Sequence, residues 1–345
     1  MGSTSEAIQT DALVIGAGPV GLFQVFQLGL QEINAHVIDV LPHTGGQCMA
    51  LYADKPIYDI PGIPRCTGRE LTERLEQQIT PFKPVFHLQQ LVSQLKRLED
   101  GRWQIGTHTG LGFITKTVFI AAGVGAFTPR KPAFEELLDL EEKQVFYREP
   151  PSHLIHGKHM VVLGADDDAL QAALNGLEHG AASVHLIHRR ENLDAGLPLL
   201  NAFKQALDQG RLHFEVAQIQ KPCIEQRLMK SLNLVSAQGI ETSLACDLLV
   251  IKLGLSPQLG PLANWSLDFS RKQIQVNTEN FSTNAAGIFA VGDINTYPGK
   301  RKLILSGFHE ATLAAFGAAA YLRPGQKIPL EYTTASPRLH RLLGV

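Results

Sequence analysis

The stretch ALVIGAGPVGLF, residues 12–23, decides the fold. The apolar residues before its first glycine predict a buried strand, and the apolar residues after its last glycine predict a helix. In such a unit, Gly16 permits a tight turn, Gly18 lets a pyrophosphate approach the backbone, and Gly21 lets the helix pack on the strand. The stretch, which includes Pro19, therefore predicts a dinucleotide site, with the phosphates on the unpaired N–H groups of the helix start.

An acidic residue follows where such a site needs one. The predicted strand His36–Ile38 ends in Asp39, eighteen residues after Gly21. A carboxylate at this place can accept hydrogen bonds from both ribose hydroxyls of an adenosine. A glycine motif alone is often only a turn, but motif, strand and acid together favour dinucleotide binding.

A second copy of the unit begins 148 residues later, at Gly164. A strand is predicted before it at Met160–Leu163, a helix after it at Ala169–Leu177, and a further strand at Val184–Ile187. This last strand ends in a basic run instead of an acid. Its guanidinium groups can fork onto a ribose 2′-phosphate, which favours NADP over NAD, although a solvated strand end is the alternative. The basic run is His188, Arg189 and Arg190.

The second glycine loop is acidic where its ligand would be anionic. Asp166 stands where the second glycine should admit the pyrophosphate. Two unit charges about 4 Å apart interact by roughly 1 to 4 kcal/mol between bulk water and a protein surface. Asp166 can also cap the helix and occupy the N–H groups that a phosphate would use. We therefore expect nucleotide binding at this loop to be weakened.

Chain length and the position of the two copies predict the domain organisation. With 345 residues, two domains are expected. Gly- and Pro-rich stretches at 123–132 and 254–261 mark the crossings, so the second copy is an insertion into the first domain. Three further buried strands and one packed helix are predicted; the tail from Pro324 is either a docked arm or frayed. These elements are the strands Val118–Ala121, Leu248–Leu253 and Ile288–Val291 and the helix Gly307–Tyr321.

Composition excludes several classes of protein. A hydrophobic content of 44% and a charged content of 19% are typical of a globular chain, and a net charge of −2 supplies no general attraction to nucleic acid. No signal peptide and no apolar run of about 18 residues is present, so we expect a cytoplasmic protein without membrane contact. No cysteine spacing favours a disulfide framework or a metal site. The cysteines are Cys48, Cys66, Cys223 and Cys246.

Several blocks of sequence, in order over nearly the whole chain, carry a family pattern. They are Gly16–Phe23, Gly45–Gln47, Leu51–Tyr52, Ile57–Asp59, Gly125–Arg130, Ile187–Arg190, Val291–Asp293, Thr296–Tyr297 and Gly299–Lys300. Together they resemble the thioredoxin-reductase-like ferredoxin–NADP+ reductases of bacteria, which are related to the pyridine nucleotide-disulfide oxidoreductases but lack a redox CxxC. The departures lie in the second glycine loop and at Asp194, where a basic residue is expected.

The resemblance implies an α/β fold of two Rossmann-like, three-layer ββα domains, the second inserted into the first. Residues 1–123 and 254–345 would bind FAD, and residues 124–253 would bind NADP. The implied function is electron transfer between NADPH and ferredoxin or flavodoxin through FAD, in a homodimer whose C-terminal arm covers the partner's flavin. Because the flavin does the redox work, no side chain is expected to be a general acid or base.

The resemblance also assigns residues to the FAD site in the first half of the chain. Asp39 would hold the adenosine ribose, and Gln47 would contact the ribityl chain or ring. Tyr52 would stack on the isoalloxazine, Val92 would meet the adenine with its backbone, and Phe127 would lie beside the flavin. The alternatives are ordinary core aromatics at Tyr52 and Phe127, a buried strand residue at Val92 and a loop residue at Gln47.

Three more assignments fall in the last fifth of the chain. Asp293 would bond the ribityl and pyrophosphate part of FAD, or cap the helix that follows. Thr334 would reach the flavin ring, and Tyr332 would lie over its face. Both could instead be tail residues without a role.

Related chemistries are less consistent with the sequence. Thioredoxin reductases use a CxxC ahead of the second glycine motif, and residues 127–164 contain no cysteine. Cys48 follows Gly45–Gln47, as in glutathione-reductase-type enzymes, but the position five residues later is Ala53. Cys48 is therefore expected to be a small buried side chain. The main alternative function is a non-enzymatic flavoprotein or redox sensor with an impaired NADP site.

An acidic ferredoxin would need a basic docking surface. Two candidates are Arg65 with Arg69, and the run Lys300–Lys302. Either could instead be ordinary solvated surface.

Overall fold

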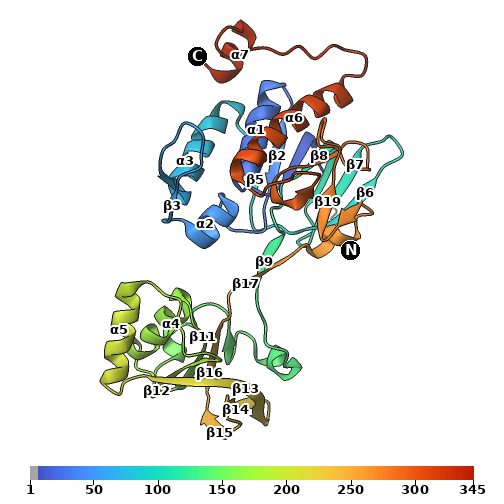
Figure 1. The fold of residues 1–345 in the computed structure, drawn as a ribbon. Coiled ribbons are helices and arrows are strands. Elements are labelled where there is room, and N and C mark those ends of the chain that lie inside the picture. Colours follow the sequence, from blue (N-terminus) through green and yellow to red (C-terminus); the bar gives the residue numbers. More distant parts are fainter. Residues whose placement is uncertain (1–6) are drawn as a thin grey trace. The chain divides into compact units, whose positions relative to one another are not determined.

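The computed structural model describes residues 7–345, without the side chains of residues 126–128 and 255–258. The chain forms two compact units (Figure 1). Unit 1 extends to Ala126 and resumes at Gln258, and unit 2 is Phe127–Pro257, inserted between the two parts of unit 1. Where the chain passes between the units, strands β9 (Ala126–Pro129) and β17 (Leu255–Gln258) pair with each other.

Unit 1 is built on a sheet in the order β5-β2-β1-β8-β7-β6, with β20 also paired to β8. Strands β1, β2, β5, β8 and β20 are parallel, while β6 and β7 are antiparallel. Two smaller sheets are β3-β4 and β18-β19-β21. The bounds are β1 Ile8–Ile15, α1 Pro19–Leu30, β2 Ala35–Ile38, α2 Gly46–Tyr52, β3 Pro56–Ile57, β4 Cys66–Thr67, α3 Gly68–Ile79, β5 Val85–His87, β6 Val92–Arg97, β7 Trp103–Thr107, β8 Gly112–Ile120, β18 Phe269–Ser270, β19 Gln273–Gln275, β20 Ile288–Ala290, β21 Asn295–Thr296, α6 Ile304–Leu322 and α7 Pro337–Leu343.

The parallel strands of unit 1 form the middle of three layers. In β1, Val14 faces a core closed by the helices α1, α3 and α6, whereas Leu13 and Ile15 face a second core closed by β6 and β7. This burial on both faces explains the continuous apolar run that precedes the first glycine. The strands and the two helices predicted for this part of the chain are present.

Helix α6 packs closely on α1 because its inner face is made of small residues. Ala311, Ala314, Ala315 and Ala318 are fully buried, and the spacing of three to four residues places them on one face. Helix α3 begins with a capping box in which Thr67 and Glu70 satisfy each other's backbone N–H groups. Helices α3 and α6 both pack on α1, which begins at the carboxyl end of β1.

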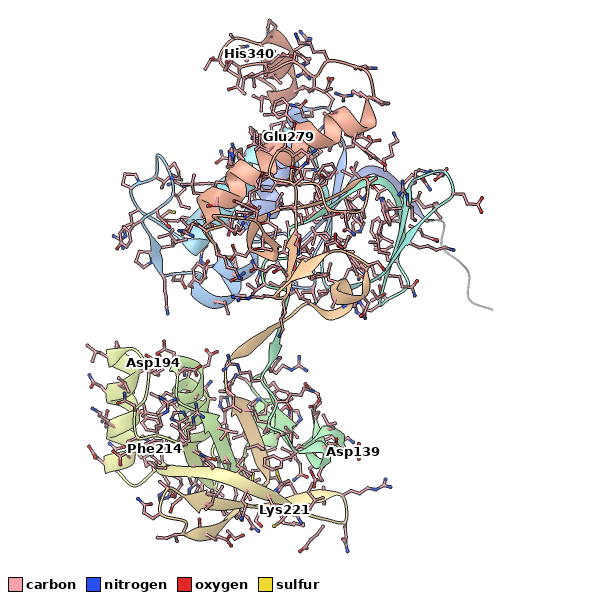
Figure 2. The ribbon with its side chains drawn as sticks, turned by 45° about the vertical axis from the view of Figure 1, so that its right-hand side comes forward. Asp139, Asp194, Phe214, Lys221, Glu279 and His340 are labelled. Carbon is pink, nitrogen blue, oxygen red and sulfur yellow. The ribbon has the colours of Figure 1, made fainter. Side chains whose placement is uncertain are left out.

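Unit 2 has a sheet in the order β10-β16-β11-β12-β13-β14-β15. Strands β10 to β13 and β16 are parallel, and β14 and β15 extend the sheet as antiparallel strands. Helices α4 and α5 cover one face, and the side chains between them and the sheet form a separate core (Figure 2). The bounds are β10 Val145–Phe146, β11 His159–Gly164, α4 Asp167–Glu178, β12 Ser183–His188, α5 Leu197–Asp208, β13 His213–Glu225, β14 Leu228–Ser236, β15 Glu241–Ala245 and β16 Leu248–Lys252.

The C-terminal tail of unit 1 is docked rather than frayed. Arg338 donates to the carbonyl of Leu30 at 3.3 Å and pairs with Glu32 at 2.9 Å, beside the end of α1. The tail closes with α7, a helix that the sequence analysis did not predict. Across residues 7–345, no helix combines the length and the apolar character that crossing a membrane requires.

Candidate functional site

The first glycine loop of unit 1 leaves the start of α1 open. A Cβ on Gly16, whose φ is +111°, would lie 2.4 Å from the carbonyl oxygen of Ala121, and a Cβ on Gly21 would lie 1.9 Å from that of Gly16. A Cβ on Gly18 would meet no described protein atom closer than 3.9 Å. Packing therefore demands the outer two glycines, whereas Gly18 keeps free the space in front of the helix.

No side chain caps α1, and Pro19 occupies its first turn. The N–H groups at this helix start can therefore bind an anion, and the positive end of the helix dipole favours one. The residues present fit the pyrophosphate of a dinucleotide.

Asp39 lies directly behind this loop, after β2. Its carboxylate accepts a hydrogen bond from the N–H of Ala17 at 2.6 Å and another from the N–H of Leu41 at 2.8 Å. Burial raises the pKa of Asp39, and the hydrogen bonds from Ala17 and Leu41 oppose this rise. Each carboxylate oxygen keeps further lone pairs that can accept from a ribose hydroxyl.

The segment between β5 and β6 is hydrogen-bonded to the backbone of Asp39. The N–H of Asp39 donates to the carbonyl of His87, and the N–H of Gln90 donates to the carbonyl of Asp39. Val92, two residues further along, is buried at the start of β6. The structure therefore brings the segment that contains Val92 beside Asp39.

Helix α2 carries Gln47 and Tyr52 from the glycine loop outward. The N–H of Gly45 donates to the carbonyl of Ala17 at 2.8 Å, which ties the start of α2 to the loop. The amide nitrogen of Gln47 lies 2.8 Å from where a Cβ on Gly123 would stand, just beyond the end of β8. Gln47 is therefore held near the carboxyl end of the central strands.

Tyr52 is half-buried at the end of α2. Its hydroxyl accepts a hydrogen bond from the thiol of Cys48 at 3.4 Å, and Cys48 is buried as expected. Burial raises the pKa of Tyr52, with further increases from Cys48 and from the carboxylates of Asp293 and Asp59. An open hollow of about 530 Å³ lies beside the ring. Its lining is Leu51, Tyr52, Lys55, Pro56, Ile57, Tyr58 and Asp59.

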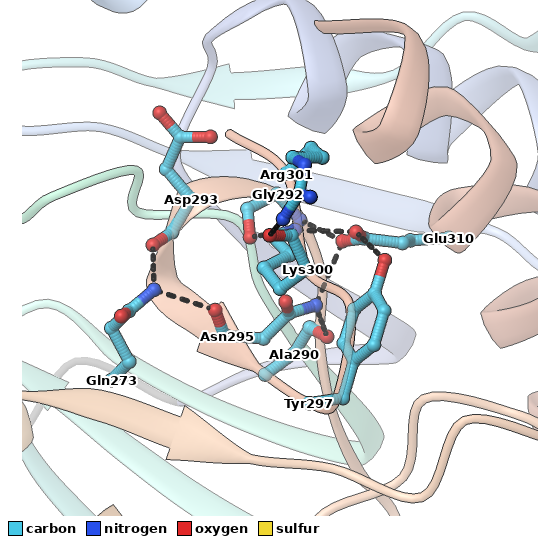
Figure 3. A network of polar contacts seen from close by, with 9 residues as sticks. All are labelled: Gln273, Ala290, Gly292, Asp293, Asn295, Tyr297, Lys300, Arg301 and Glu310. Carbon is cyan, nitrogen blue, oxygen red and sulfur yellow. Dashed lines mark hydrogen bonds and ion pairs between the residues drawn. The ribbon is translucent and has the colours of Figure 1, made fainter. Parts of the chain in front are cut away.

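Asp293 follows β20 in a short 3-10 turn, Gly292–Ile294, on the other side of the site. Burial raises the pKa of Asp293, while the ammonium groups of Lys300 and Lys302 lower it. Within the described part of the chain, no donor is bonded to its carboxylate. Figure 3 shows this carboxylate turned away from the polar network beneath the turn. A ligand hydroxyl can use this half-buried acceptor.

The network beneath Asp293 contains residues that the sequence analysis missed. Glu310 of α6 is fully buried and accepts hydrogen bonds from Gly292, Asn295 and Tyr297 (Figure 3). Lys300 pairs with the same carboxylate. The sequence did contain an indication, because Glu310 is the only acidic residue in α6, a mostly apolar, Ala-rich helix.

Lys300 therefore does not belong to an exposed basic run. Its side chain is only 7% exposed, whereas Arg301 and Lys302 are exposed. The expectation that all three residues form a docking surface was wrong for Lys300, since buried Glu310 draws its ammonium group inward. In the other candidate pair, exposed Arg69 forms an ion pair with Asp54 at 3.2 Å.

Tyr332 and Thr334 are not brought to this site. Both are exposed in the tail, and the tail is tied to the carboxyl end of α1 by Arg338. The glycine loop lies at the other end of that twelve-residue helix, about 18 Å away along the axis. The side chain of Phe127 lies outside the part of the structure that is described.

The second glycine loop, in unit 2, is already capped. A Cβ on Gly164 would lie 2.3 Å from the carbonyl oxygen of Lys252, so packing demands this glycine. The carboxylate of Asp166 accepts a hydrogen bond from the N–H of Ala169 at 3.1 Å and caps α4, as the sequence allowed. A side chain of the protein therefore already uses one donor of this helix start.

Further carboxylates surround this loop. The N–H of Asp194 donates to the carbonyl of Ala165 at 2.8 Å, and Asp194 is labelled in Figure 2. Asp167 and Asp168 lie in the first turn of α4. Burial raises the pKa of Asp166, and the charges of Asp168 and Asp167 raise it further. The loop is thus acidic in three dimensions as well as in sequence.

The basic run begins at the last residue of β12, at the same end of the unit 2 sheet as the glycine loop. Arg189 and Arg190 are exposed, and a ring nitrogen of the half-buried His188 lies 3.1 Å from the carbonyl oxygen of Arg190. Parallel pairing of β11 with β12 places this run and Gly164 at neighbouring strand ends. Both guanidinium groups are accessible to an anionic ligand.

Comparison with known proteins gives matches over the whole chain. The sequence profile of the pyridine nucleotide-disulphide oxidoreductases matches residues 49–292. The chain is 52% identical over 340 residues to a ferredoxin–NADP reductase 2 of Cupriavidus metallidurans, covering 99% of this chain and 92% of that protein. It is 52% identical over 341 residues to a ferredoxin–NADP reductase of Polaromonas naphthalenivorans, covering 98% of this chain and 93% of that protein.

Solved structures share the fold at low sequence identity. The bacillithiol disulfide reductase of Staphylococcus aureus matches 92% of this chain and all of its own, with a TM-score of 0.64 at 15% identity. A thioredoxin reductase of T. acidophilum matches 90% of this chain and 98% of its own, with a TM-score of 0.58 at 19% identity. The fold is therefore that of two Rossmann-like dinucleotide-binding domains, the second inserted into the first. The chain belongs to the pyridine nucleotide-disulphide oxidoreductase family, in the group of its ferredoxin–NADP reductases.

Proposed function

We propose that this protein is a flavin-dependent ferredoxin–NADP+ reductase, which transfers electrons between NADPH and ferredoxin or flavodoxin through bound FAD. The observation that carries the proposal is an open dinucleotide loop in unit 1 of a chain that matches named ferredoxin–NADP reductases over its full length. We assign FAD to unit 1 and NADP to unit 2.

The residues around the first glycine loop fit FAD. Gly16, Gly18, Pro19 and Gly21 would present the start of α1 to the pyrophosphate, and Asp39 would accept the adenosine ribose hydroxyls. The backbone near Val92 would meet the adenine. On the flavin side, the contacts would come from Gln47, Tyr52 and Asp293, with Phe127 as a further candidate.

When bound, FAD would supply hydride acceptance and single-electron transfer. The role of the protein chain is to position the bound FAD. Like any tyrosine, Tyr52 is protonated near neutral pH, and its raised pKa extends the range in which it can stack as a neutral ring to higher pH. No titratable side chain is assigned a role as general acid or base.

For NADP, Gly164 would permit the turn, and His188, Arg189 and Arg190 would meet the 2′-phosphate. The capped and acidic start of α4 opposes the pyrophosphate, so we expect weaker NADP binding than an open loop would give.

A homodimer is consistent with two features of unit 1. Phe23 of α1 stacks on Phe26 and lies at a tilt against Phe308 of α6, and these three partly buried rings form an aromatic cluster across the two helices. The tail residues Tyr332 and Thr334 are exposed and remote from the site of their own chain, so they are available to the flavin of a second copy. We also propose a cytoplasmic location, without contact with membrane or nucleic acid.

An acidic electron partner would dock on the exposed basic residues Arg301 and Lys302, with Arg65 as a further contact. Replacing Arg301 and Lys302 by Glu should lower the on-rate for ferredoxin at low salt by about tenfold, because electrostatic steering governs that rate. Stopped-flow reduction of ferredoxin measures this rate, with Lys96→Glu, at an exposed position of β6, as the control. Equal rates at low salt for the original protein, the Arg301 and Lys302 variant and the control variant would remove this surface from the proposal.

Anaerobic titration of the purified protein with NADPH and with NADH, followed at the flavin absorbance, tests the proposed function. Rapid bleaching by NADPH, followed by reduction of added ferredoxin, is the expected result. A colourless protein that takes up no added FAD would contradict it.

One observation favours a second function, that of a non-enzymatic flavoprotein or redox sensor. Asp166 already caps the helix that NADP would use. Persistent flavin colour under excess NADPH, in a protein that retains FAD, would support the sensor.

A further inference from the structure

A buried ion pair lies beneath the turn that carries Asp293. The side chains of Lys300 and Glu310, which form it, are 7% and 0% exposed. Removing two charges from water is costly, and apolar residues of similar size would often stabilise a fold as well or better. The pair is therefore poorly explained by stability alone, and its contacts indicate what else it does.

The pair holds both polar atoms of one residue. Glu310 accepts a hydrogen bond from the N–H of Gly292 at 2.7 Å, and the ammonium group of Lys300 donates to the carbonyl oxygen of Gly292 at 2.9 Å. Gly292 has a φ of +79°, and Asp293 is the next residue. The ion pair thus fixes the backbone on the amino side of Asp293, in a conformation that glycine tolerates best.

Two amide side chains complete the support (Figure 3). Asn295 donates to Glu310 at 2.7 Å and to the carbonyl of Ala290 at 2.9 Å. Gln273 donates to the carbonyl of Asp293 at 3.2 Å. Each of these contacts holds the backbone around Asp293 or orients Glu310, and none of those described reaches the carboxylate of Asp293, which remains available to a ligand.

We infer that Lys300 and Glu310 are positioning residues of the FAD site, which act through the backbone of Asp293. This inference rests on the proposed function, in which Asp293 bonds the ribityl and pyrophosphate part of FAD. Neither residue needs to touch the cofactor. Their contribution is to hold one carboxylate where a hydroxyl of bound FAD can reach it, since a hydrogen bond weakens steeply with misalignment.

Two variants separate this role from a purely structural one. Lys300→Met leaves the charge of Glu310 buried and unpaired, so the thermal midpoint of the FAD-free protein should fall. Lys300→Met with Glu310→Gln removes both charges, so that midpoint should largely recover. The clamp on Gly292 is damaged in both, so the Kd for FAD should rise by about tenfold or more in both.

Tyr297→Phe is the matched control. It removes the hydroxyl that donates to Glu310 at 2.9 Å and leaves both bonds to Gly292 in place. Its Kd for FAD should stay within about twofold of the original protein. Quenching of flavin fluorescence on adding FAD to the stripped full-length protein measures Kd without any need for catalytic activity.

The decisive comparison is made in a protein that already carries Asp293→Ala and therefore lacks the carboxylate. If Lys300 and Glu310 act through Asp293, adding the double change to Asp293→Ala should raise Kd by less than about twofold. A rise in Kd of about tenfold when the double change is added to Asp293→Ala would overturn the inference. Recovery of both FAD affinity and the thermal midpoint in the variant Lys300→Met with Glu310→Gln would also overturn it. An original protein that binds no FAD would instead remove the proposed function and this inference together.

Discussion

The three glycines of the first loop, Gly16, Gly18 and Gly21, are not all required for the same physical reason. Gly16 and Gly21 are required by the protein itself, because a methyl group at either would overlap a carbonyl oxygen. Gly18 has no such neighbour, and the space in front of it lies at the uncapped start of α1. Of these three glycines, only Gly18 can be substituted to weaken ligand binding without also disturbing the fold.

Gly18→Ala is expected to fold with a thermal midpoint close to that of the original protein, but to bind FAD at least about tenfold more weakly, because the methyl group occupies space meant for phosphate. Gly21→Ala is the paired comparison. Its overlap with Gly16 should destabilise the fold by about 2 kcal/mol or more. Differential scanning fluorimetry and FAD titration measure both effects, and a Gly18→Ala protein with unaltered FAD affinity would contradict the assignment.

Asp166 shows how one side chain can both stabilise a helix and weaken a site. It caps α4, and its negative charge lies where a pyrophosphate would bind. Burial and the neighbouring carboxylates of Asp168 and Asp167 raise its pKa. The negative charge of Asp166 is therefore lost on acidification at a higher pH than the charge of an exposed aspartate.

Asp166→Asn should keep the cap, because Asn caps helices as well as Asp. Without the charge, NADP+ should bind about tenfold more tightly at pH 8. The difference between the two proteins should shrink as the pH falls through the raised pKa, because the original carboxylate then becomes neutral. Calorimetric titration at several pH values gives the ratio of the Kd values for NADP+ of the original and Asp166→Asn proteins. Titration of the 2′-phosphate affects both Kd values equally and cancels in this ratio.

Asp139→Asn, at an exposed position of unit 2 (Figure 2), is the control for a general charge effect. It should leave NADP+ affinity nearly unchanged. A ratio between the original and Asp166→Asn proteins that does not vary with pH would contradict the titration of Asp166.

At the scale of elements, α7 shows how a short helix is held by local contacts. Ser336 caps it by accepting from the N–H of Leu339 at 3.2 Å, Pro337 fills its first turn, and Leu339 is buried. The ion pairs of Arg338 with Glu32 and Glu331 are partly exposed. Such pairs contribute little on their own, so among the polar contacts of α7 the cap is the one most sensitive to substitution.

Ser336→Ala should cost α7 about 1 kcal/mol. Because the helix is short and peripheral, the loss should appear as faster hydrogen exchange in residues 337–343, with little change in the global thermal midpoint. Arg341→Ala, which leaves the cap intact, serves as the comparison. Unchanged exchange in Ser336→Ala would show that Leu339 and Arg338 hold α7 without the cap.

At the scale of the whole molecule, each unit has its own hydrophobic cores. The two cores of unit 2 draw only on residues 134–253, and the two cores of unit 1 draw only on residues outside that range. Among the described residues, no core cluster is shared between the units. Each unit therefore has what it needs to fold independently.

The fragment 127–257 is accordingly expected to fold when produced alone, with a single cooperative transition in circular dichroism. It should bind 2′,5′-ADP through the basic run after β12, and Arg189→Ala should weaken this binding by about tenfold. A fragment without a cooperative transition would show that contacts with unit 1 are needed for its stability.

The sequence by itself determined the strand–glycine–helix units, their duplication and the family, because apolar runs and glycine positions are local constraints on the backbone. It also indicated that Asp166 could cap α4, since a cap needs only neighbouring residues. Helix α7 was missed, although Ser336 and Pro337 are a cap and a first-turn residue, because a short helix offers little periodicity.

Only the tertiary structure decided which charges are buried. Lys300 lies in a basic run and was expected on the surface, but it turns inward because Glu310, ten residues later on α6, reaches the same turn. The tertiary structure likewise decided that Tyr332 and Thr334 lie at the far end of α1 from the site of their own chain. Contacts between residues far apart in the chain depend on packing, which periodicity and local motifs do not encode.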